Sequence, residues 1–216
     1  MSPLIAPRPI ATSAPEDHVT VVDLPVGHAL GEEAGNRLAH ALTDTDAGVR
    51  RAAADALIDE TEVLIGEEGV RALVAAESDG PDPYVRAVAA ELVRAMRAAA
   101  WEIYARALSR EDAARAQTVR GLAALRAAAE LGEVALTDPD WRVRRRAVTA
   151  LGGLDSREAI GPLTSVLEDE IVSVRRSAVR ALGTWAADRH YARTALTAAL
   201  KDPDAGVRAE ARWALA

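Results

Sequence analysis

One unit, a short acidic turn followed by an amphipathic helix, recurs along the chain. Its clearest copy runs from Asp138 to Leu151, with the sequence DPDWRVRRRAVTAL. Similar copies begin at Asp44, Asp169 and Asp202, and another at Asp79 carries one extra residue. Such a repeat indicates an array of modules, because each copy has to bury its apolar face against the next one.

Each copy carries signals for a turn and for the helix that follows it. In four copies an Asp precedes the Arg of a Val-Arg pair by six residues. Two of these turns read Asp-Pro-Asp, in which the proline cannot continue the preceding helix and the second Asp can N-cap the next one. Apolar residues then follow at i, i+4, i+7 and i+8, as in Val143, Ala147, Ala150 and Leu151, which is one face of an α-helix.

The residues before each turn also read as helix, so each unit is a helical hairpin. The ends of these first helices are marked by Leu42, Leu108, Leu136, Leu167 and Leu200. We therefore predict an all-α solenoid of about six helical hairpins over residues 27–216. Residues 1–26 form a separate proline-rich segment, which we expect to be an extended or disordered tail.

The repeat is weakest over residues 97–131. Arg110 stands where the turn Asp is expected, and Ala116 stands where the Arg of Val-Arg is expected. Two interpretations are open. In one, the third hairpin is degenerate; in the other, Glu111 to Thr137 form a longer helix bent near Gly121 or Gly132. We favour the degenerate hairpin.

The pattern Leu-x-Asp-x-Asp-x-x-Val-Arg-x-x-Ala-x-x-Ala-Leu resembles HEAT repeats, specifically the short variety first noted in phycobilisome lyases. The resemblance implies a right-handed α-α superhelix. It also implies a structural ladder in which turn aspartates and Val-Arg arginines link adjacent hairpins. On this chain the ladder residues are Asp44, Arg50, Asp138, Arg144, Asp169, Arg175, Asp202 and Arg208.

Composition limits what the protein can do. The chain has no Cys, which excludes disulfides, thiolate metal sites and a Cys nucleophile. Its aromatic content is 3%, which leaves little material for stacking bases or flat cofactors. No apolar run approaches the length of a membrane span, and the N-terminus lacks a basic region followed by an apolar core. We expect a cytoplasmic protein with no membrane attachment.

Positive charge is concentrated towards the C-terminus of an acidic chain whose net charge is −7. In HEAT repeats, the family that this chain resembles, the second helix of each hairpin lines the concave surface. The positions opposite the buried face of those helices hold Arg142, Arg145, Arg146, Arg176 and Arg180, with Trp213 in the same column. These arginines are either ordinary solvated helix faces, the interpretation that we favour for them, or a docking surface for carboxylates or phosphates. Trp213 could be an interface anchor, because Trp beside Arg is the composition of interface hot spots.

No catalytic, cofactor or metal site is visible in the sequence. The four His residues form no i, i+4 pair and have no carboxylate at metal-ligand spacing. The di-iron hydroxylases built on HEAT repeats use His-Glu dipeptides, and this sequence has none. Glycine-rich phosphate loops are also absent.

The leading functional prediction is a non-enzymatic scaffold or adaptor that presents its concave surface to a protein partner. Two alternatives stay open. One is a nucleic-acid-binding protein resembling the HEAT-like alkylpurine DNA glycosylases, against which the overall acidity argues. The other is an accessory protein resembling HEAT-type lyases. Self-association through the C-terminal hairpin is a further expectation, because no polar capping unit follows it.

Overall fold

The computed structural model describes residues 31–59, 65–108, 112–154, 156–185 and 190–216. All regular structure within these ranges is helical, and no strand occurs in them. The predicted all-α solenoid is therefore confirmed. The proposed tail at 1–26 lies outside the described residues.

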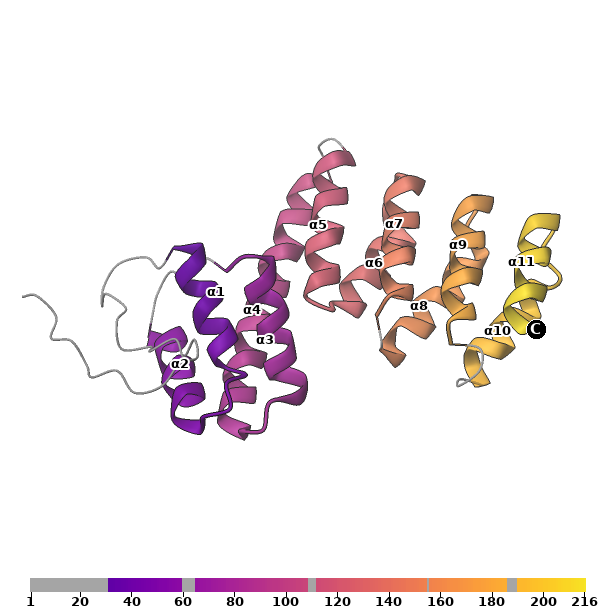
Figure 1. Ribbon diagram of the computed structural model, residues 1–216. Helices are drawn as coiled ribbons and strands as arrows, with labels where there is room; N and C mark the ends of the chain where they lie inside the picture. Colours follow the sequence, from indigo (N-terminus) through magenta and orange to yellow (C-terminus); the bar gives the residue numbers. More distant parts are fainter. Residues whose placement is uncertain (1–30, 60–64, 109–111, 155, 186–189) are drawn as a thin grey trace, which may run out of the picture.

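Helices pair into hairpins along the array (Figure 1). α1 (Glu32–Ala41) pairs with α2 (Ala47–Asp59), α3 (Glu67–Asp79) with the first part of α4 (Pro83–Ala107), and α6 (Ala128–Thr137) with α7 (Trp141–Gly152). α8 (Ile160–Ser165), between the 3-10 turns η2 (Arg157–Ala159) and η3 (Val166–Glu168), pairs with α9 (Val172–Gly183). α10 (His190–Ala199) pairs with α11 (Ala205–Leu215), and α5 (Asp112–Ala124) packs between α4 and α7.

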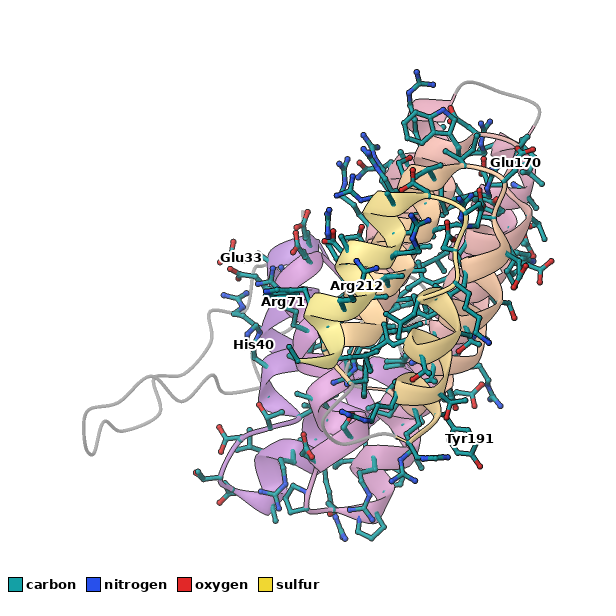
Figure 2. The ribbon with its side chains drawn as sticks, turned by 90° about the vertical axis from the view of Figure 1, so that its right-hand side faces the viewer. Glu33, His40, Arg71, Glu170, Tyr191 and Arg212 are labelled. Carbon is teal, nitrogen blue, oxygen red and sulfur yellow. The ribbon has the colours of Figure 1, made fainter. Side chains whose placement is uncertain are left out.

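The second helices α5, α7, α9 and α11 stand side by side in one row, and the first helices α6, α8 and α10 form another (Figure 1). In the view along the array, Arg212 of α11 lies on one side of the molecule and Tyr191 of α10 on the other (Figure 2). The two rows thus expose opposite surfaces, and the core lies between them.

The repeated apolar positions form this core, as predicted. Val143, Ala147 and Leu151 of α7 have exposed fractions of 1%, 0% and 0%. The equivalent residues of α9, Val174, Ala178 and Leu182, are each 0% exposed. Most of these side chains are small, so neighbouring helices can approach closely, and stability is distributed over many hairpin-to-hairpin contacts.

The middle of the array departs from the regular pattern in α4. This helix runs for 25 residues without a break, so it is both the second helix of the second hairpin and the first helix of the third. Its sequence has no Gly and no Pro after Pro83, and therefore nothing interrupts it. No sequence feature indicated that one continuous helix would belong to both hairpins.

The residues after α4 form two helices, as the degenerate-hairpin interpretation requires. α5 ends at Ala124 and α6 begins at Ala128, so the alternative of one long helix with a bend near Gly121 or Gly132 is wrong. The chain reverses at Arg126, whose φ of 51° is left-handed. Arg97 of α4 supports this turn, because its Nε and Nη2 donate to the carbonyl oxygen of Leu125 at 3.0 and 2.8 Å.

Neighbouring second helices are in close contact at glycines near their C-terminal ends. A Cβ atom on Gly152 of α7 would lie 2.7 Å from Cβ of Ala181 in α9, and one on Gly183 would lie 3.0 Å from Cβ of Ala214 in α11. The same glycine-to-alanine contact thus recurs at successive junctions. Absence of a side chain at these positions sets how closely the second helices can stack.

We predict that Gly152→Ala destabilises the protein by about 1–3 kcal/mol, because the added methyl group overpacks the contact with Ala181. The control is Gly121→Ala in α5, where an added Cβ would meet nothing within 4 Å. That change should stabilise the helix by about 0.5–1 kcal/mol, since alanine loses less backbone entropy than glycine. Chemical denaturation of both variants measures the two effects. Equal shifts in the same direction would contradict the packing argument.

Candidate functional site

Two successive junctions carry the same buried ion pair between neighbouring hairpins. Nε and Nη2 of Arg144 donate to the Asp169 carboxylate at 2.7 and 3.1 Å. Arg175 binds Asp202 in the same way, at 2.8 and 3.1 Å. These bidentate, charge-assisted bonds are the strong kind, and each joins one hairpin to the next along the chain.

The remaining nitrogen of each arginine holds its own turn. Nη1 of Arg144, Arg175 and Arg208 donates to the carbonyl oxygen six residues earlier, at 2.9, 2.8 and 2.7 Å. The aspartate has a second role as well, because its Oδ1 accepts from the amide two residues later at 2.8 Å in Asp169 and Asp202. One such Arg–Asp ion pair, which we call a rung, therefore fixes two turns and the distance between them.

At the first junction the rung differs from the expected one. Arg50 was expected to reach a neighbouring carboxylate, but its Nη1 donates only to the carbonyl oxygens of Asp44 and Thr45, and its buried Nε has no hydrogen-bond partner. Arg51 reaches Asp82 instead, with 2.7 Å between Nε and Oδ2. The position six residues before Arg86, where other turns have the rung aspartate, is Gly80, which has no carboxylate, although Arg86 Nη1 still donates to its carbonyl oxygen at 2.6 Å. Asp82, the N-cap of α4, binds Arg51 instead.

Asp138 is bound by residues that the sequence analysis did not select. Its Oδ2 accepts from Tyr104 Oη at 2.9 Å and from Arg115 Nε at 3.1 Å. All three are buried, with exposed fractions of 1%, 2% and 6% for Asp138, Tyr104 and Arg115. Arg144 does not bind the Asp138 carboxylate: it binds the main chain at Asp138 and the carboxylate of Asp169 in the next hairpin.

A signal for Arg115 was present in the sequence. Arg115, Val119, Leu122 and Leu125 have the same spacing as Arg144, Val148, Leu151 and Leu154. The missing Val-Arg pair placed the expected arginine one residue too late, at Ala116. No sequence pattern pointed to Tyr104, because its contact depends on the uninterrupted course of α4. Burial, followed by the hydrogen bond to Asp138, raises the pKa of the Tyr104 hydroxyl far above its ordinary value.

We predict a strong coupling between Asp138 and Arg115 and almost none between the Asp138 and Arg144 side chains. Asp138→Ala should destabilise by about 3–5 kcal/mol, because it removes the carboxylate that the buried Arg115 guanidinium binds. In a double-mutant cycle, Asp138→Ala with Arg115→Ala should show about 1–3 kcal/mol of interaction energy, and Asp138→Ala with Arg144→Ala less than about 0.5. The reverse order would contradict the assignment of Arg115 as the partner of Asp138.

The rung at Asp202 also makes a pH-dependent contribution to stability. Burial opposes ionisation of this carboxyl, but hydrogen bonds from Arg175 and from the Asp204 amide, with the nearby arginine charges, lower its pKa below the ordinary value. A carboxyl whose pKa is lower in the folded state stabilises the fold above its unfolded pKa and loses that contribution as the pH falls through the folded pKa.

Comparison with Asp202→Asn isolates this contribution. At pH 7 the wild type should melt at a higher temperature than the variant, because the ionised carboxylate binds Arg175 more strongly than an amide does. The difference should shrink as the pH falls below about 4, the ordinary pKa of an aspartate. Thermal melts at matched ionic strength measure it. A difference independent of pH would show that the charge of Asp202 is not what stabilises the rung.

The exposed sides of α7, α9 and α11 form a surface that we call the second-helix face. On α7 the guanidinium carbons of Arg142 and Arg145 lie 5.0 and 5.2 Å from the ring centroid of half-buried Trp141. Such contacts hold arginine side chains in place while their donors stay in solvent. Arg146 is exposed beside them, and the carboxylate nearest to this group is Asp140, 3.8 Å from Arg142.

Arg176 and Arg180 do not join these residues as free cations. Both bind Glu210 of α11: Arg176 Nη2 lies 3.2 Å from Oε2, and Arg180 Nε binds Oε1. Hydrogen bonding by Arg180, and then by Arg176, outweighs burial and lowers the pKa of the Glu210 carboxyl. The expectation of one basic patch of five arginines is therefore corrected, because Glu210 neutralises part of the charge on α9.

Trp213 is the largest apolar side chain left in solvent on this face. Its exposed fraction is 80%, although it lies in a well-formed part of α11, one helical turn after Glu210. The surface thus offers arginine donors on α7, a neutralised arginine pair on α9 and an aromatic side chain on α11. It can bind anionic groups and bury an apolar one.

Among the described residues, no group of three or more His, Asp or Glu residues could hold a metal ion. No helix in the described ranges is long and apolar enough to cross a membrane.

Comparison with known proteins supports the repeat assignment. Residues 128–216 match the family model for HEAT repeats, so the resemblance is confirmed over this part of the chain. No curated protein matches the chain.

Three solved structures illustrate the similarities in fold. The complex of CpcE and CpcF of phycocyanin lyase from Nostoc has 26% identity, a TM-score of 0.45, and coverage of 68% of this chain and 98% of that one. Human deoxyhypusine hydroxylase has 23% identity, a TM-score of 0.49, and coverage of 85% and 73%. A designed armadillo repeat protein in complex with a (KR)4 peptide has 19% identity, a TM-score of 0.36, and coverage of 85% and 81%.

Proposed function

We propose that the protein is a non-enzymatic binding module whose second-helix face docks a protein partner. The observation that carries this proposal is the arginine group of α7. Arg142 and Arg145 are held against Trp141, with Arg146 beside them, and among the described residues no carboxylate binds these three at hydrogen-bond distance. Exposed, oriented arginines next to aromatic side chains are the composition from which interface hot spots are built.

A protein partner fits this surface better than a nucleic acid does. A duplex requires a continuous row of cations along its backbone. On the second-helix face that row is interrupted at α9, because Glu210 already occupies Arg176 and Arg180. The net charge of −7 also opposes association with a polyanion.

We predict that Arg142→Glu/Arg145→Glu/Arg146→Glu loses the partner and keeps the fold. The three side chains project from the exposed side of α7, so their reversal removes no core contact. The measurement is affinity capture from native lysate with quantitative mass spectrometry, beside circular dichroism at 222 nm. A partner is assigned to this face only if the purified protein binds the wild type and not the variant.

The matched control is Arg157→Glu/Arg193→Glu/Lys201→Glu, which reverses three exposed cations on η2, α10 and the turn before α11. It makes the same change in net charge away from the second-helix face, so it should retain the partner. Loss of the partner in both variants would show that net charge alone decides binding. Retention of duplex DNA by the wild type at 150 mM salt would favour the nucleic-acid alternative.

A further inference from the structure

The second helices α7, α9 and α11 carry different residues at equivalent positions, and the repeat makes these positions directly comparable. Counting from the buried Val of each helix (Val143, Val174, Val207), position i+3 is Arg146 in α7, Ser177 in α9 and Glu210 in α11. Position i+2 is Arg145 in α7 and Arg176 in α9, and position i+6 is Thr149 in α7 and Arg180 in α9. The junctions α7–α9 and α9–α11 can therefore be compared residue by residue.

At the α9–α11 junction a carboxylate crosses between the helices. Glu210 at i+3 of α11 binds Arg176 and Arg180, which lie at i+2 and i+6 of α9. The Glu210 side chain is 20% exposed, so the carboxylate is partly withdrawn from solvent between the two arginines. This arrangement shows how a carboxylate is received by this surface: in the seam between two second helices, with guanidinium donors from the helix before it.

At the α7–α9 junction the positions equivalent to this contact hold one arginine and no acid. Ser177 takes the place of the glutamate, and its hydroxyl donates to the carbonyl oxygen of Ser173 at 3.0 Å. Arg145, at the position equivalent to Arg176, has its guanidinium over the Trp141 ring, and Thr149 stands at the position equivalent to Arg180. Position i+3 of α9 therefore offers Arg145 no carboxylate, in contrast to position i+3 of α11, which offers Glu210 to Arg176.

We propose that the α7–α9 seam binds a carboxylate side chain from an acidic segment of a partner protein, in the place that Glu210 takes at the α9–α11 junction. Arg145 supplies the guanidinium equivalent to that of Arg176, and Arg142 and Arg146 contribute further positive charge. The occupant is a protein carboxylate because the surface already receives one, Glu210, at the next junction, where Arg176 is the equivalent of Arg145. This inference rests on the proposed function and adds to it the chemical class of the partner.

Glu210 has a second consequence under this proposal. Its carboxylate competes with an acidic partner for Arg176 and Arg180, so it limits how far along the face an acidic segment can bind. Removing the charge of Glu210 should extend the cationic surface from α7 onto α9. Placing a glutamate at Ser177 should have the opposite effect, because the new carboxylate would lie in the seam that the partner needs.

The test uses a defined probe, a fluorescein-labelled peptide of twelve residues that alternates Glu and Gly, and its Gln-for-Glu counterpart. Fluorescence anisotropy on the full chain should show binding of the Glu peptide only, weakening as salt rises. Arg142→Gln/Arg145→Gln/Arg146→Gln should weaken it at least about tenfold, and Ser177→Glu about threefold or more; Glu210→Gln should strengthen it about threefold. Arg157→Gln/Arg193→Gln/Lys201→Gln is the control and should change it less than about twofold.

Ser177→Glu and Glu210→Gln are expected to change the peptide affinity in opposite directions. The proposal can therefore still be tested if one of them folds poorly, and thermal melts identify such a variant. Equal peptide affinity in wild type, Ser177→Glu and Glu210→Gln would contradict the proposal that the α7–α9 seam binds the carboxylate. Failure of the Glu peptide to bind the wild type at 50 mM salt would overturn it too. Either result leaves the docking function standing if the α7 charge-reversal variant still loses its partner. Tighter binding of duplex DNA than of the peptide at equal salt would assign the surface to phosphates.

Discussion

The bidentate pair between an arginine of one hairpin and the turn aspartate of the next is the interaction on which the regular part of the array depends. Arg144 with Asp169 and Arg175 with Asp202 repeat it with nearly equal distances. Each aspartate also holds its own turn, and each arginine holds the turn behind it. Turn conformation and hairpin spacing are therefore set by the same few atoms, and neither can change alone.

This dual role explains why the fold could be predicted from sequence while individual contacts could not. The spacing from Asp to Arg and the buried positions such as Val143 and Leu151 repeat at fixed intervals, so both are visible in one chain. The partner of an arginine, in contrast, depends on how the next hairpin lies. Arg50 and Arg51 are adjacent in the sequence, and Arg51 forms the ion pair because Gly80 stands where the next turn would supply a carboxylate for Arg50.

The second-helix face, too, could be predicted only in part from the sequence. Helical periodicity placed Arg142, Arg145 and Arg146 on the exposed side of α7 and Trp213 on that of α11, where the structure has them. It could not show that Arg176 and Arg180 are engaged, because a Glu–Arg contact between helices 30 residues apart leaves no local pattern. A comparison of equivalent positions in successive repeats does reveal it, since Glu210 of α11 stands where α7 has Arg146 and α9 has Ser177.

Because helix α4 is continuous, the array is not equally stiff along its length. Within the hairpins α6–α7, α8–α9 and α10–α11 the two helices are joined by short turns. A solenoid of such hairpins can be pulled apart one hairpin at a time under load. Across α4 the second and third hairpins share one rod of 25 residues, and a helix bends far less readily than a turn. A pulling force would therefore open the hairpins after Asp138 in succession and then meet a stiffer unit. In that unit, α4 is fastened to the next hairpin by the buried contact of Tyr104 with Asp138.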